Sequence, residues 1–139
     1  MNENTPLLAV RDLSVDFRTG DTTVHAVRSI DFTIERGETV ALVGESGSGK
    51  SATALSILQL LPSPPASHPS GSILLDGDEL LGASAATLQS VRGERISMIF
   101  QEPMTSLNPL HTIEKQVGET LVLHKGISRE EAKSRTLEL

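Results

Sequence analysis

The chain has 139 residues, of which 37% are hydrophobic and 22% are charged, so it is long enough for one globular domain with an apolar core. The formal net charge is −6, which argues against nucleic acid as a partner, because binding a phosphate backbone needs a basic face. The lack of cysteine excludes disulfides and thiolate metal sites, and no apolar run approaches the ~18 residues of a membrane span.

Alternating apolar residues mark the first part of the chain. Apolar and polar side chains alternate at residues 13–17 and 30–34, which predicts half-buried strands over residues 8–17 and 23–34. Because only a turn separates these segments, we expect them to form an antiparallel β layer. The short apolar run at residues 39–43 is rich in β-branched side chains and predicts a buried strand.

Residues 44–51 read GESGSGKS and match the phosphate-binding pattern G-x-x-x-x-G-K-S. Glycine lets the backbone turn so that successive N–H groups point at one anion, and a helix beginning after the loop adds the positive end of its dipole. Lys50 can reach outer phosphates, and the Ser51 hydroxyl can ligate Mg²⁺. The strand at 39–43 and a leucine-rich helix predicted over 51–61 supply the required strand–loop–helix order. The predicted nucleotide-binding residues in this segment are Gly44, Ser46, Gly47, Ser48, Gly49, Lys50 and Ser51.

The rest of the chain reads as short elements joined by turns. Four prolines in residues 62–71 predict an exposed connector. A strand that ends in the Asp76-Gly77 turn follows this connector. A short helix is expected over 85–92, a buried strand over 95–100 and a loop over 101–110. A helix over 112–125 ends at Gly126, and the capping box beginning at Ser128 opens another.

Two further features of the sequence indicate which kind of phosphate-binding protein this is. Residues 98–109 read MIFQEPMTSLNP, and Phe17 precedes the glycine-rich loop behind a turn. Together with GESGSGKS, this arrangement resembles the ATP-binding subunits of ABC transporters, most closely the peptide, oligopeptide and nickel importer group. The resemblance implies an incomplete α/β P-loop NTPase fold of the ABC ATPase type within one ATP-binding domain over residues 1–139. Residues 7–100 would form the antiparallel β layer and P-loop core, 101–111 the Q-loop, and 112–139 the start of a helical subdomain.

The resemblance also implies roles for individual residues. Phe17 falls where the family places an aromatic ring against adenine, and residues 46–51 would wrap the β- and γ-phosphates of ATP. Gln101 falls at the Q-loop glutamine, whose amide oxygen would ligate Mg²⁺ or orient the attacking water. Lys50 and Gln101 are thus the expected catalytic residues, and Ser51 and Gln101 the expected Mg²⁺ ligands. The segment after Gln101 would meet transmembrane permease subunits.

The implied function is ATP hydrolysis that powers import of a small solute, most simply a peptide, through a membrane permease. The subunit would pair with a second ATP-binding subunit at the cytoplasmic face of the inner membrane, as a peripheral protein. The family's LSGGQ signature, catalytic glutamate and switch histidine do not occur in the sequence. We therefore expect an N-terminal fragment of a longer ATPase that binds ATP and hydrolyses it poorly.

Other interpretations remain open at this stage. The chain could be a non-hydrolytic nucleotide-binding module or another P-loop enzyme such as a small-molecule kinase, although its arginines are scattered. Phe17 could be ordinary strand core, and Gln101 a simple polar loop residue. Asp76 follows an apolar strand, as a Mg²⁺-binding aspartate would, but an Asp-Gly surface turn explains it better.

Overall fold

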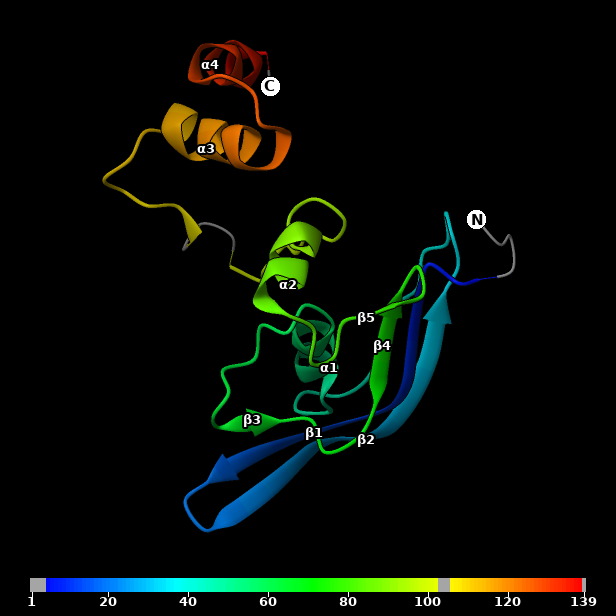
Figure 1. The fold of residues 1–139 in the computed structure, drawn as a ribbon. Helices are drawn as coiled ribbons and strands as arrows, with labels where there is room; N and C mark the ends of the chain where they lie inside the picture. The colour runs from blue at the N-terminus through cyan, green and yellow to red at the C-terminus, as the bar shows by residue number, and fades with distance from the viewer. Residues whose placement is uncertain (1–4, 103–105, 139) are drawn as a thin grey trace. The chain divides into compact units, whose positions relative to one another are not determined.

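The computed structural model describes residues 5–102 and 106–138 and divides into two compact units, residues 1–89 and 90–139. The first unit is built on a five-stranded antiparallel sheet in the order β2-β1-β4-β5, with β3 also paired to β1. Its strands are β1 (Leu8–Thr19), β2 (Thr22–Ile34), β3 (Ala66–Ser67), β4 (Ser72–Leu75) and β5 (Asp78–Glu79). Figure 1 shows β1 and β2 as a long hairpin with β4 beside β1.

Turn chemistry fixes the register of this sheet. A two-residue turn pairs Thr19 with Thr22, and Gly20 adopts a φ of 60° there. Asp76 and Gly77 have φ values of 53° and 89°, so both central residues of the β4–β5 hairpin are left-handed, as a type I′ turn requires. The predicted antiparallel layer and the Asp-Gly turn are therefore confirmed.

The core of the first unit lies on one face of β1 and its neighbours. Leu13, Val15, Ile73 and Leu80 are fully buried, and Val27 of β2 is nearly so. On β1 the buried Leu13 and Val15 alternate with the half-buried Ser14 and Asp16, which is the period-two pattern that the sequence predicts, whereas residues 8–10 are all buried. The buried face holds the hairpin in one register, because a slip by one residue would turn the apolar set to solvent.

Helix α1 (Lys50–Ile57) is shorter than the sequence predicts. It ends in a Schellman motif in which the N–H of Leu60 donates to Leu55 O at 2.8 Å and the N–H of Gln59 donates to Ser56 O at 3.0 Å. Gln59 occupies the left-handed position with a φ of 51°, where glycine is usual. The helix therefore stops before residues 58–61 can extend its apolar face.

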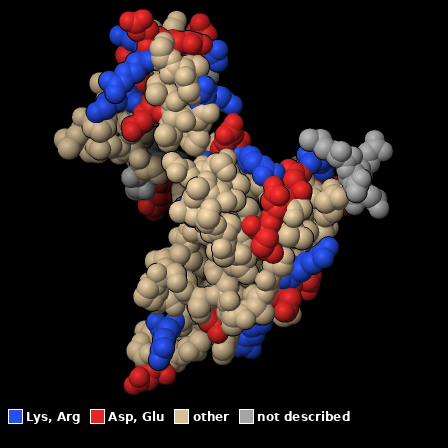
Figure 2. Space-filling view, in the orientation of Figure 1, with Lys and Arg blue, Asp and Glu red and all other residues tan. Residues whose placement is uncertain are grey.

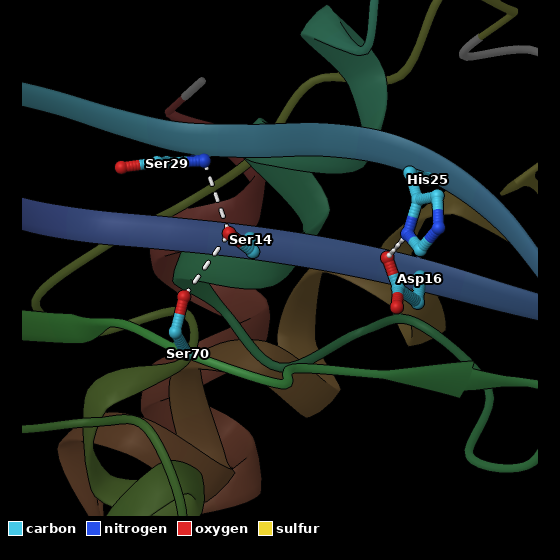
Figure 3. Close-up of polar contacts among 5 residues, drawn as sticks. All are labelled: Ser14, Asp16, His25, Ser29 and Ser70. Atoms are coloured by element: carbon cyan, nitrogen blue, oxygen red, sulfur yellow. Dashed lines mark hydrogen bonds and ion pairs between the residues drawn. The ribbon is translucent and has the colours of Figure 1, made fainter.

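The proline-rich connector is more ordered than expected. It contains β3, whose Ala66 is buried, and Ser70 binds back to β1. The Ser70 hydroxyl donates to the Ser14 hydroxyl at 3.0 Å, and the same Ser14 oxygen accepts the Ser29 N–H at 3.0 Å (Figure 3). One serine of β1 thus ties β2 to the connector.

Two predicted buried strands do not form. Residues 39–43 lie outside any strand, with Leu42 and Val43 exposed to 52% and 85%. Residues 95–100 make only one bridge, between Arg92 and Ile96, and Ile99 is 89% exposed. A strand needs neighbours to bond its backbone, and in the described part of the chain no strand lies beside either segment. Both predictions of buried strands are wrong for this chain.

Helix α2 (Ala85–Val91) crosses the boundary between the units, and two capped helices form the second unit. Thr112 caps α3 (Ile113–Lys125) by accepting the Lys115 N–H at 3.2 Å, and Gly126 ends it with a φ of 64°. Ser128 caps α4 (Arg129–Leu137) through the Glu131 N–H, as the capping box predicts. Acidic and basic side chains are mixed on these helices (Figure 2), including the 3.5 Å ion pair between Lys133 and Glu114.

Candidate phosphate-binding site

The side chain of Lys50 folds over the glycine-rich loop. Its ammonium nitrogen, Nζ, donates to Gly44 O at 2.9 Å, to Glu45 O at 2.6 Å and to Ser48 Oγ at 3.3 Å. These three oxygens belong to the loop itself, so the positive charge sits at the loop rather than extending into solvent. Contact of Lys50 with outer phosphates stays a prediction.

Glycine is required at the end of the loop for steric as well as conformational reasons. Gly49 has a φ of 92°, and a Cβ built there would lie 2.5 Å from Ala26 O and 3.1 Å from Val27 Cγ2. Gly47 also has a positive φ, of 81°, but faces open space. The loop therefore passes directly against β2 at Gly49, where no larger residue fits.

The first turn of α1 begins at this contact. Gly49 is the N-cap residue and provides no side-chain cap. Thr53 anchors the turn, because its N–H and its hydroxyl both donate to Gly49 O, at 2.8 and 3.0 Å. Thr53 is buried, whereas Ser51, the predicted Mg²⁺ ligand, is exposed on the first turn. The positive end of a well-anchored helix thus adjoins the loop.

An open hollow of about 380 Å³ adjoins Lys50. It is lined on one side by residues 25–28 and 30 of β2 and on the other by residues 42–44, 48, 50 and 53. At its β2 end, His25 Nδ1 lies 2.8 Å from Asp16 Oδ1 across the hairpin (Figure 3). The combination of a cation, loop amides and a helix N-terminus beside a hollow suits a phosphate-bearing ligand.

The remaining predicted site residues lie apart from the loop in sequence. Phe17 is half-buried on β1, opposite Val24 of β2 and Ala66 of β3. Gln101 belongs to the second unit and is exposed in a bend. Adenine stacking by Phe17 and any action of Gln101 on a nucleotide at the loop stay predictions. Asp76, the rejected metal candidate, forms an ion pair with Arg36.

The loop after Gln101 is held by a residue that sequence reasoning missed. The Gln116 side chain accepts the Asn108 N–H at 2.8 Å and donates to Asn108 O at 3.1 Å and to His111 O at 3.0 Å. Leu110, between these two residues, is 89% exposed. Residues 103–105 of the predicted Q-loop segment lie outside the described residues. A glutamine one turn into a helix is too common a signal to have identified this contact.

Among the described residues, the helices are all too short or too polar to cross a lipid bilayer.

A family model described as ABC transporter matches residues 27–138 of the chain. A peptidoglycan transport ATP-binding protein of Agrobacterium fabrum is 63% identical over 134 residues, which are 96% of this chain and 24% of the relative. An oligopeptide transport ATP-binding protein of Bacillus subtilis is 49% identical over 97% of this chain and 38% of the relative. The chain thus spans about a quarter to two fifths of the length of these curated relatives.

A solved structure provides a comparison of the fold. It is a dimeric ATP-binding cassette in a post-hydrolysis state bound to ADP and Pi, with a TM-score of 0.79 and 26% sequence identity. The match covers 94% of this chain and 54% of that one. A second structure of that cassette, also a dimer, matches equally well.

Proposed function

The chain belongs to the ABC transporter family, and from that premise we propose that residues 44–51 bind the phosphates of Mg-ATP. The observation that carries the proposal is the Lys50 ammonium group held over the loop beside the hollow. Gly49 supports it, because glycine at a positive φ lets the backbone turn so that successive N–H groups can converge on one anion.

Each residue of the loop has a separate task in this proposal. The amides of residues 46–51 donate to phosphate oxygens, and the N-terminus of α1 adds its dipole. Lys50 exchanges its loop acceptors for the outer phosphates. Ser51 and Gln101 would hold Mg²⁺ through their side-chain oxygens, and the ion, when bound, would neutralise charge that develops during phosphoryl transfer. Phe17 would contact the adenine ring.

The whole protein, in the same proposal, couples ATP hydrolysis to import of a small solute, most simply a peptide. The names of the relatives support this, since they are peptidoglycan and oligopeptide transport proteins. A permease would be the membrane partner, and a second ATP-binding subunit would complete the active assembly on the cytoplasmic face of the membrane. The matched cassette is itself dimeric.

Titration with Mg-ATP tests the binding step. The wild-type chain, Lys50→Ala and the control Lys125→Ala, which removes an exposed lysine of α3, are compared by calorimetry and by the amide shifts of residues 44–51. We expect Lys50→Ala to abolish binding and Lys125→Ala to leave it unchanged. If Lys50→Ala binds Mg-ATP as tightly as wild type, the site is misplaced.

Measuring phosphate release on the same samples separates an ATPase from a non-hydrolytic nucleotide-binding module. Binding without turnover would favour the module for this chain. Turnover that Lys50→Ala removes would favour the ATPase.

A further inference from the structure

Ser14 of β1 lies where β2 contains a β-bulge. Between two regular pairs of the hairpin, the single residue Ser14 faces two residues of β2, Arg28 and Ser29. Ser29 has a φ of 46°, in the left-handed region that a non-glycine residue keeps only where surrounding contacts hold it. Its N–H donates to the Ser14 hydroxyl oxygen at 3.0 Å, and its own hydroxyl donates to the carboxylate of Asp12. The shape of β2 at this point therefore depends on side chains of β1.

The bulge lies directly beyond the part of β2 that the glycine-rich loop contacts. Ala26 and Val27 are the residues that a Cβ at Gly49 would meet, at 2.5 and 3.1 Å. Ser29 follows Val27 by two residues. Because a bulge bends and twists its strand, the bulge at Ser29 determines how residues 26–27 lie against the loop.

The same serine holds the proline-rich connector. The Ser14 N–H donates to Ser70 O at 3.1 Å, and the Ser70 hydroxyl donates back to the Ser14 hydroxyl oxygen at 3.0 Å (Figure 3). The next residue, Gly71, packs against β1, because a Cβ there would lie 2.8 Å from Leu13 Cα. Ser14 thus joins the connector on one side of β1 to the bulge of β2 on the other.

The connector in turn holds the end of α1. The Ser56 hydroxyl donates to Ala52 O at 2.7 Å, so the Nε2–H of His68 donates to the Ser56 oxygen at 3.0 Å. Ser56 is fully buried. Helix α1 is therefore held by β2 at Gly49, where it begins, and by the connector at Ser56, near its end. Both contacts lead back to Ser14, which bonds to β2 and to the connector through one oxygen.

We propose that Ser14 is a positioning residue of the phosphate-binding site, which keeps α1, the loop amides and Lys50 in the geometry that receives the phosphates. This inference rests on the proposed function, since it assumes that the phosphates bind at residues 44–51. Ser14 touches no ligand and acts through β2 and the connector. Removing its hydroxyl frees the Ser29 N–H and the Ser70 hydroxyl together, so nucleotide binding must then restore an arrangement that wild type already has.

Three variants isolate this role. Ser14→Ala removes the shared oxygen, and Ser14→Thr keeps it. Ser72→Ala is the matched control, because Ser72 is a half-buried serine of the same sheet whose hydroxyl donates to Glu79 rather than to β2 or the connector. Urea unfolding gives the stability of each variant, and calorimetry gives its affinity for Mg-ATP. In the nucleotide-free chain, the amide signals of Gly49 and Thr53 report on the start of α1, where the Thr53 N–H donates to Gly49 O.

We expect Ser14→Ala to shift the amide signals of Gly49 and Thr53 and to weaken Mg-ATP binding about threefold to tenfold, the scale of one hydrogen bond. Ser14→Thr should restore both, and Ser72→Ala should change neither, even where it lowers stability as much. Unchanged Mg-ATP affinity in Ser14→Ala, or equal weakening in Ser72→Ala, would overturn the inference while leaving the proposed site intact. Failure of wild type to bind Mg-ATP would overturn the proposed function instead. If Ser14→Ala does not fold, Ser70→Ala, which removes the donor from the connector alone, replaces it with the same outcomes deciding.

Discussion

Replacing Gly49 with alanine tests how closely the glycine-rich loop is packed against β2. The new Cβ would lie 2.5 Å from Ala26 O, a main-chain atom that cannot rotate away. Alanine at a φ of 92° adds left-handed strain of about 1–2 kcal/mol, and moving the backbone to relieve the overlap adds about 1–3 kcal/mol. We therefore expect Gly49→Ala to lower the free energy of unfolding by about 2–5 kcal/mol.

Gly47→Ala is the matched control, because Gly47 has a similar φ of 81° but meets nothing within 4 Å. It carries the same strain without the overlap, and the effect of alanine on the unfolded chain is common to both variants. Urea unfolding of the nucleotide-free chain, followed by circular dichroism, gives the difference. Equal losses in the two variants would show that the loop does not press on Ala26.

Three further predictions concern single side chains. Burial lowers the pKa of His68 below 6.5, so the contribution of His68 to stability is complete above pH 6.5 and falls as the pH drops below that value. His68→Gln should flatten the stability–pH curve below pH 6.5, and an unchanged slope in this variant would contradict the prediction. Burial raises the pKa of Glu79, but hydrogen bonds, including one from the Ser72 hydroxyl, outweigh it and lower that pKa. The stability that Glu79 contributes should therefore be lost as the pH falls below 4.5. Glu79→Gln should remove this pH-dependent loss and cost about 0.5–1.5 kcal/mol at neutral pH, which urea titrations at several pH values would measure. Gln116→Ala removes the acceptor of the Asn108 N–H and should speed its hydrogen exchange about threefold to tenfold, whereas an unchanged rate would mean that the loop is held by other contacts.

Local sequence signals predicted much of this structure. The hairpin turns, the cap at Ser128 and the stop at Gly126 each depend on a few neighbouring residues, and all are confirmed. The predicted fold class is confirmed as well, since the chain superimposes on solved ATP-binding cassettes. The domain boundaries within that fold, at residues 100 and 111, stay predictions.

Features that depend on distant or unusual partners were not predictable in this way. The apolar runs at residues 39–43 and 95–100 have strand-like sequences, but a buried strand forms only where other strands bond its backbone. Gln59 ends α1 at a position where glycine is the usual signal.

The hydrogen-bond acceptors of the Lys50 ammonium group show at which loop positions the identity of the side chain matters for holding the lysine. Two of the three are carbonyl oxygens, at Gly44 and Glu45, and every amino acid has such an oxygen. The carboxylate of Glu45 takes no part in those bonds, so its replacement by serine would leave all three acceptors of the lysine in place. An arriving phosphate would have to displace these main-chain carbonyls from the ammonium group, so the heat released on binding would understate the attraction between phosphate and lysine.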